Sequence, residues 1–350
     1  MLLLLFNLIW SLVSVPTTWL YTSITCLHII RRDRWTLQRI TVVLLIGANV
    51  SRILAKIFML RLNEAYETKI NNSQFGFRRN WATNIAIFLL KSVIDKYNDT
   101  LIAVYIDLTA AYDHMPRNFP FKVLDLRTGA SHLIAILYKM CRGATASIFG
   151  MKERFEVLFG CRQRGQESPY IFNYYFDYVL KVAAWEIDKK FPDGWGIEFV
   201  FNIPHLCTNR EQRKSGRLNG VEIVIWLLYA DDLVLFCKIV AEVKTIMNIL
   251  NGTCSRFGLT ISFPKTKTQV FNNDELANLN SLFSSGDNEV ENVSESIYLG
   301  QTFRNKTQGI FQWRIRGEGS GGPWPPLTFR PNWGLGRTKK IFLETGPSLN

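Results

Sequence analysis

Two strand-length apolar segments that each lead into an acidic residue constrain the fold of this chain most. Residues 101–106 are apolar or aromatic throughout and are followed at once by Asp107. Residues 221–228 and 233–237 are two further, largely apolar segments, separated by residues 229–232, which read YADD. Segments of this length fit buried strands, and two of them around a tight acidic turn predict a β-hairpin.

The three aspartates at these strand ends are candidates for a cation site. Burying carboxylates beside apolar strands is costly unless a cation compensates their charge, and carboxylate oxygens suit hard divalent cations, Mg²⁺ above all. Two such ions about 4 Å apart would activate an attacking hydroxyl and stabilise a leaving phosphate. Residue type alone leaves an alternative open, in which Asp231 and Asp232 form an ordinary acidic turn and Asp107 caps a helix.

The amino-acid composition limits the classes of protein to which this chain can belong. The chain has 350 residues, 47% of them hydrophobic, which is enough for the core of one large domain or two ordinary ones. Lysine and arginine exceed aspartate and glutamate by 41 to 29, and the resulting net charge of +12 favours a polyanionic partner. The 6 cysteines and 4 histidines form no CxxC pair or zinc-ligand set, so we expect reduced thiols in an intracellular protein.

The N-terminus raises the question of a membrane segment. Residues 1–30 contain no charged side chain and are followed by Arg31, Arg32 and Arg34. An uncharged segment of this length with basic residues at its end is typical of a membrane-spanning helix. Pro16 interrupts the segment, and residues 1–15 alone are too short to span a bilayer. A membrane anchor is therefore kept as the alternative to an intracellular, nuclear or cytoplasmic location.

Periodicity predicts the helices and the irregular regions. Helices are expected in the latter half of residues 36–70, at 82–95, at 168–190 with Pro169 in the first turn, and at 241–257 before Gly258. Residues 191–220 mix Pro, Gly and charge and are expected to form a loop insertion. Residues 304–350, rich in Gly, Pro and Trp, are expected to form a disordered tail.

Motifs across residues 74–300 resemble, in order, those of the reverse transcriptases of non-LTR (LINE-type) retrotransposons. They are QFGFR at 74–78, YIDLTAAYD at 105–113, RQ at 162–163 with SPYIFN at 168–173, YADD at 229–232, GLTI at 258–261 with KTK at 265–267, and YLG at 298–300. A weaker resemblance extends upstream, where Pro16 and Trp19 precede residues 31–33 and 39–41. It implies that residues 16–41 belong to the fingers of a polymerase.

The resemblance implies an α/β (α+β) fold of the right-hand polymerase type. Fingers are expected at residues 16–100 and a palm with an antiparallel sheet at residues 101–303, after an apolar N-terminal segment at residues 1–15. Little chain follows Gly300, so the thumb is expected to be largely missing. No endonuclease domain is expected before residue 16.

The implied activity is RNA-directed DNA polymerisation, in which dNTPs are added to the 3′-hydroxyl of a DNA primer on an RNA template by a two-metal mechanism. Asp107 and Asp231 would bind two Mg²⁺ ions, with Asp232 beside them. Lys265 would protonate the leaving pyrophosphate, although a solvated surface lysine is the alternative reading.

The remaining implied roles concern the nucleotide and the primer. Tyr112 would lie under the incoming sugar and exclude a 2′-hydroxyl, with core packing as the alternative. Arg78 and Arg39 would hold the triphosphate, since guanidinium groups suit phosphate oxygens. Gln163 would contact the nucleotide or the template, and Leu299-Gly300 would grip the primer strand.

One departure from the family pattern bears on activity. Arg164 stands where the family has a glycine close to the nucleotide, and its side chain would obstruct the site unless Gly165 compensates. Two alternatives therefore stay open. One is an inactive retrotransposon remnant with residual nucleic-acid binding, and the other is a protein like the group II intron maturases, which should carry a basic splicing domain after the palm.

Overall fold

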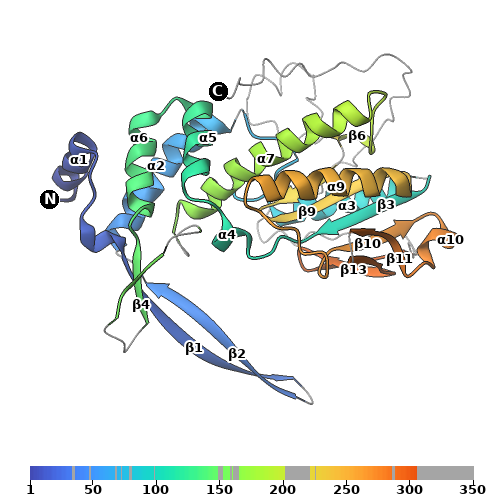
Figure 1. Ribbon diagram of the computed structural model, residues 1–350, viewed down its shortest axis with the longest axis horizontal. Helices are drawn as coiled ribbons and strands as arrows, with labels where there is room; N and C mark the ends of the chain where they lie inside the picture. Colours follow the sequence, from blue (N-terminus) through green and yellow to red (C-terminus); the bar gives the residue numbers. More distant parts are fainter. Residues whose placement is uncertain are drawn as a thin grey trace, which may run out of the picture. The chain divides into compact units, whose positions relative to one another are not determined.

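The apolar strands predicted from the sequence come together in one sheet. The computed structural model describes residues 1–305, except 34–35, 47–48, 68, 72, 79–80, 98, 149–152, 158–159, 161–164, 202–220, 225 and 286–287. Within these residues the protein is a mixed α/β structure, as the sequence predicts (Figure 1). Most of the predicted tail at 304–350 lies outside the described residues.

The largest sheet among the described residues has the strand order β11-β12-β10-β3-β9-β8. Its strands are β3 (Leu101–Ile106), β8 (Trp226–Tyr229), β9 (Asp232–Cys237), β10 (Lys267–Phe271), β11 (Ser281–Ser285) and β12 (Asn288–Asn292). All neighbours pair antiparallel except β10 and β12, which are parallel. The predicted antiparallel sheet and the predicted hairpin of β8 and β9 are confirmed.

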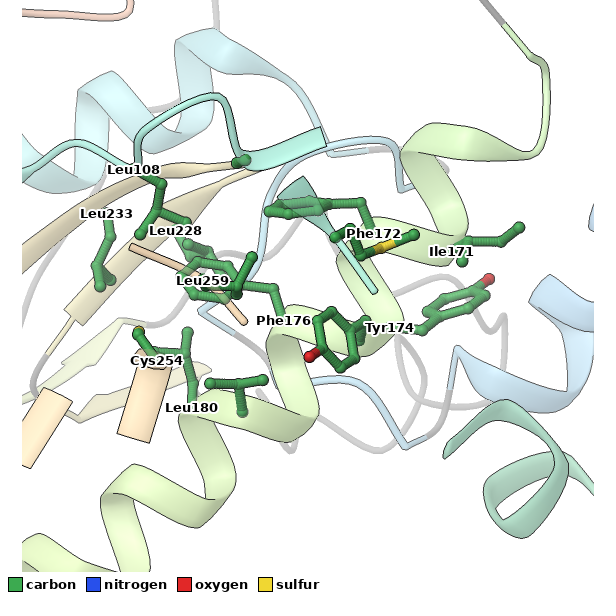
Figure 2. Close-up of a cluster of buried hydrophobic side chains, with 14 of the residues drawn as sticks. Leu108, Ile171, Phe172, Tyr174, Phe176, Leu180, Leu228, Leu233, Cys254 and Leu259 are labelled. Carbon is green, nitrogen blue, oxygen red and sulfur yellow. The ribbon is translucent and has the colours of Figure 1, made fainter. Parts of the chain in front are cut away.

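Helices cover both faces of this sheet, which explains why β3 is apolar without alternation. Ile102, Val104 and Ile106 belong to one buried cluster with side chains of α7 (Ser168–Lys190) and α9 (Val240–Arg256). Leu101 and Ala103 belong to a second cluster with side chains of α3 (Thr83–Lys96). Figure 2 shows part of the first cluster, in which Phe172, Phe176 and Leu180 of α7 lie beside Leu228, Leu233 and Leu259.

The predicted helices are present near their expected bounds, and α9 is followed at Gly258 by a positive φ of 74°. That left-handed conformation is one that glycine adopts without a Cβ penalty, so it suits the residue after a helix.

Two sequence predictions near residue 221 are wrong. Residues 221–228 were expected to form one strand, but β7 (Val221–Val224) pairs with β6 (Glu198–Phe201) and β8 pairs with β9. The expected loop at 191–220 therefore contains a strand, and its residues 202–220 lie outside the described part. Each of β6 and β7 has one glutamate and three apolar or aromatic residues, a composition that suits a short strand of a separate hairpin.

The N-terminal region combines a second sheet with four helices. Its sheet has the order β2-β1-β4-β5, from β1 (Tyr21–Asp33), β2 (Thr36–Ile46), β4 (Thr145–Ile148) and β5 (Phe155–Glu156). Its helices are α1 (Leu2–Leu12), α2 (Asn49–Tyr66), α5 (Asn118–Thr128) and α6 (Ser131–Cys141), with the 3₁₀ turn η1 (Thr17–Leu20) after α1. Within the described residues, no helix has both the length and the apolar character needed to cross a membrane.

Three short elements complete the described chain. The helix α4 (Ala111–His114) follows β3, and α10 (Asp274–Ala277) follows β10. The strands β13 (Glu295–Tyr298) and β14 (Gln301–Arg304) form a hairpin that follows the main sheet in the sequence. This hairpin packs against the sheet, because Tyr298 and Phe303 belong to the same buried cluster as Leu101 of β3.

Candidate active site

Asp107 is the residue immediately after β3, at the end of the sheet where the candidate site lies. Its backbone carbonyl accepts a 2.8 Å hydrogen bond from the amide of Ser262, which fixes the backbone where the strand ends. Its carboxylate oxygen Oδ2 is buried and accepts no hydrogen bond from the described residues. The Nζ atom of Lys265, whose side chain is 71% exposed, lies 3.5 Å from this oxygen. Lys265 thus lies beside Asp107.

Asp231 and Asp232 are brought to the same end of the sheet by a two-residue turn. Tyr229 pairs with Asp232 across this turn, and the turn residue Ala230 has a positive φ of 58°. The register of β3 and β9 pairs Ile106 with Leu233, so Asp107 and Asp232 are the next residues at the same ends of the two strands.

The charges of the three carboxylates repel one another. Burial, followed by the charges of Asp231 and then Asp107, raises the pKa of Asp232 to about 6. Burial also raises the pKa of Asp231, a hydrogen bond to its backbone lowers it, and the Asp107 charge raises it. The structure therefore places the three predicted carboxylates close enough to interact electrostatically.

The donor set fits a hard divalent cation by charge and by chemistry. Carboxylate oxygens are the ligands that such ions prefer, and Oδ2 of Asp107, which accepts no hydrogen bond from the described residues, is an available ligand atom. As the side chains stand, no group of three or more His, Cys, Asp or Glu in the described part of the chain converges to hold a metal ion. Binding would therefore require the carboxylates to rotate toward one another.

Tyr112 lies on α4, five residues after Asp107. Its ring is half-buried and packs against the ring of Phe172 on α7, with 4.5 Å between the ring centroids. Gly160 approaches the same helix so closely that a Cβ added to it would lie 2.7 Å from the carbonyl oxygen of Asp113. This close approach, which the sequence analysis did not identify, places Gly160 against α4.

Arg78 requires a correction. Its side chain is only 6% exposed, with Nη2 2.7 Å from the carboxylate of Glu67. Its Nη1 donates hydrogen bonds to the backbone carbonyls of Asn71 and Gln74, and the guanidinium stacks on Trp81 at 4.3 Å from the ring centroid. Because these internal contacts occupy the guanidinium, the structure assigns Arg78 to holding the segment 71–78 and not to the predicted triphosphate site.

The structure describes only some of the other predicted binding residues. Arg39 lies in β2, of which the backbone register with β1 is described. Gln163, like Arg164, lies outside the described residues. Leu299 and Gly300 form the turn between β13 and β14, with φ values of 49° and 81°, as two-residue hairpin turns of the primed types require.

The hairpin turn at 299–300 lies near the carboxylates. The buried hydroxyl of Tyr298, the residue before the turn, accepts and donates no hydrogen bond in the described part of the chain. Burial raises the pKa of this hydroxyl, and the charge of Asp232 raises it further. The predicted primer-gripping residues and the predicted catalytic residues therefore belong to one region.

Gly76 tests how tightly the turn at Ala230 is packed. A Cβ added to Gly76 would lie 2.4 Å from the backbone nitrogen of Ala230, an atom that cannot move away alone. We expect Gly76→Ala to lower the free energy of unfolding by about 1–3 kcal/mol, measured by urea denaturation. Gly252→Ala is the matched control, because Gly252 lies in α9 with open space around it and alanine favours helices. Equal stability of Gly76→Ala and the wild type would contradict the close packing.

Comparison with known proteins adds three findings. The sequence model of the family described as reverse transcriptase (RNA-dependent DNA polymerase) matches residues 43–303. Comparison with curated proteins gives no match.

Two similar solved structures are telomerases of Candida tropicalis. An apo telomerase truncated from its C-terminal domain is 10% identical, with a TM-score of 0.45 and coverage of 83% of this chain and 54% of the telomerase. A telomerase in complex with a TWJ fragment of telomeric RNA is 11% identical, with a TM-score of 0.49 and coverage of 85% and 46%. The chain thus spans about half the length of these telomerase chains.

Proposed function

Because the chain belongs to the reverse transcriptase (RNA-dependent DNA polymerase) family, we propose that it adds dNTPs to the 3′-hydroxyl of a primer on an RNA template. The observation that carries this proposal is the gathering of Asp107, Asp231 and Asp232 at one end of an antiparallel sheet, where burial and then the neighbouring carboxylate charges raise the pKa values of Asp231 and Asp232. An ordinary acidic turn in solvent would keep its carboxylates apart and hydrated.

The three aspartates are proposed to hold the cations of the reaction. Asp107 and Asp231 would be ligands, with Asp232 beside them. Two Mg²⁺ ions bound there would activate the primer hydroxyl and stabilise the leaving pyrophosphate. The chain's own contribution is to bring the three carboxylates to neighbouring strand ends at one edge of the sheet.

Other residues are proposed to position the substrates. Lys265, whose Nζ lies 3.5 Å from Oδ2 of Asp107, would donate a proton to the departing pyrophosphate. The turn at Leu299-Gly300 would contact the primer strand, and Arg39 and Gln163 would contact the triphosphate and the nucleotide or template. The net charge of +12 would add salt-dependent affinity for the nucleic-acid backbone.

We assign the chain to the non-LTR (LINE-type) branch of the family on the order of its motifs. The experiment is primer extension with the purified chain on poly(rA)/oligo(dT), with Mg²⁺ and dTTP. The expected result is incorporation that requires the template and stops when EDTA is added. No incorporation on RNA or on DNA templates would refute the proposed activity.

The alternative of an inactive remnant depends on Arg164. If its side chain fills the nucleotide pocket, the wild type incorporates little dTTP and Arg164→Gly raises kcat/KM. A variant no faster than an active wild type would exclude the obstruction and leave the polymerase proposal intact.

Tyr112 is proposed to exclude ribonucleotides by the position of its ring. Tyr112→Val should raise the efficiency of ribonucleotide incorporation relative to dNTP incorporation, because removing the ring opens space beneath the 2′ position. Tyr112→Phe keeps the ring and its packing on Phe172, so it should keep the wild-type ratio. The measurement is kcat/KM for dTTP and for UTP on one template. The same ratio in Tyr112→Val and wild type would make Tyr112 a core residue only.

A further inference from the structure

The segment 73–75 pairs with the strand that leads into the YADD turn. The amide of Phe75 donates a 2.7 Å hydrogen bond to the carbonyl of Leu228, and the amide of Leu228 donates a 2.9 Å bond to the carbonyl of Ser73. Gln74 and Leu228 form a parallel bridge. Since β8 is the outermost strand of its sheet in the described chain, this segment covers the sheet edge just before the turn.

The side chain of Gln74 continues this pairing into the turn itself. It is fully buried, and its Oε1 accepts hydrogen bonds from the amides of Gly76 at 2.7 Å and Ala230 at 3.2 Å. Its Nε2 lies 3.5 Å from the carbonyl oxygen of Ala230 and from Oδ1 of Asn173. One glutamine amide therefore contacts both backbone polar groups of the residue that precedes Asp231.

Ala230 needs such support because of its conformation. Its φ of 58° is left-handed, a region that is unfavourable for a non-glycine residue because its Cβ crowds the following carbonyl oxygen. A strained residue keeps this conformation only where its surroundings hold it. The direction of the following Asp231 depends on the backbone of Ala230, so contacts that hold Ala230 also orient the carboxylate.

The helix α7 anchors the segment that carries Gln74. Asn173, which is 1% exposed, donates a 2.6 Å hydrogen bond from Nδ2 to the carbonyl of Gly76. One turn further along α7, Asp177 accepts a 2.9 Å bond from the amide of Asn71. Both ends of the segment 71–76 are thus fixed to one long helix.

We propose that Gln74 and Asn173 are positioning residues that hold the Ala230 turn in the conformation that presents Asp231 and Asp232. The effect on catalysis rests on the proposed function, whereas the effect on the turn does not. Both residues act through contacts with the backbone of Gly76 and Ala230, and within the described residues neither forms a hydrogen bond with the three carboxylates. Loss of either contact releases the turn from its left-handed conformation and misaligns the aspartates.

The test uses Gln74→Met, which keeps the volume of the side chain and removes its amide. Hydrogen exchange of the segment 226–234 in the apo protein, followed by mass spectrometry, should become about tenfold faster, since one buried hydrogen bond to the Ala230 amide is lost. Gln269→Met is the matched control. Gln269 is also fully buried and accepts hydrogen bonds from Tyr105 and Ser296. It lies on β10, which β3 separates from the hairpin of β9 and β8.

The control separates positioning from stability. We expect both variants to melt at a lower temperature, but only Gln74→Met to accelerate exchange at 226–234. If Gln74→Met changes exchange there no more than Gln269→Met does, the proposal is wrong. If Gln74→Met does not fold, Asn173→Ala is tested in the same way, since it removes the bond to Gly76 and leaves the Gln74 acceptor in place.

Kinetics then test the consequence for catalysis. In primer extension, Gln74→Met should lower kcat about a hundredfold and leave KM for the primer–template close to the wild-type value. The double variant Gln74→Met/Asn173→Ala should lose little more than either single variant, because both residues hold one turn. A rise in KM with unchanged kcat would overturn the positioning role.

A wild type inactive on every template would refute the proposed function, while the exchange comparison would still decide whether Gln74 holds the turn.

Discussion

We expect the Asp231→Asn protein to fold like the wild type and to incorporate no dNTP. Asparagine keeps the shape of the side chain and removes its charge, which weakens the binding of the cations that the proposed mechanism requires. The same change removes the repulsion that Asp231 exerts on Asp232 and Asp107. The apo protein should therefore unfold at the same urea concentration as the wild type or at a slightly higher one.

Asp274→Asn is the control for a general effect of losing one acidic residue. Asp274 is exposed in the first turn of α10. This helix follows the end of β10, where Phe271 pairs with Leu101. Leu101 is at the end of β3 farthest from Asp107, so Asp274 lies away from the candidate site. Primer extension by Asp274→Asn should match the wild type. Wild-type extension by the Asp231→Asn protein would show that Asp231 is not a cation ligand.

The second large effect concerns stability and arises at Asp177 on α7. Its carboxylate is 1% exposed and accepts hydrogen bonds from Nζ of Lys181 at 2.7 Å, the hydroxyl of Tyr66 at 3.2 Å and the amide of Asn71 at 2.9 Å. Burial lowers the pKa of Lys181, and the Asp177 charge opposes that shift. Asp177→Leu should lower the free energy of unfolding by about 3–5 kcal/mol, because it removes the negative charge that compensates the largely buried Lys181 ammonium and takes one acceptor from the Tyr66 hydroxyl and from the Asn71 amide.

Two controls show whether the buried charge causes this loss. Asp177→Leu/Lys181→Met removes the unpaired ammonium as well, so it should be more stable than Asp177→Leu alone. Glu295→Gln breaks the exposed pair of Glu295 with Arg304 and should cost at most about 1 kcal/mol. Urea denaturation of the four proteins is the measurement. An Asp177→Leu protein that loses no more stability than Glu295→Gln would contradict the role of Asp177.

Local signals explain why many elements could be predicted from the sequence. The helix at 168–190 has Pro169 in its first turn and an apolar face, and the strand at 101–106 is an apolar segment of strand length. Both depend on residues close in sequence, and both are present at those bounds. The separate pairing of β6 with β7 was missed, because strand partners far apart in sequence leave no local signal.

The sequence by itself determined which residues carry the candidate chemistry, namely the three aspartates, and that two of them follow or begin buried strands. Only the tertiary structure decided how those residues are held. Arg78 is turned inward by Glu67 and by the carbonyls of the segment 71–76, and Gln74 reaches Ala230 across 156 residues of sequence. A motif records which side chains are present. Whether a guanidinium or an amide faces a ligand or the protein depends on the donors and acceptors that folding brings around it, because a buried polar group must find partners there.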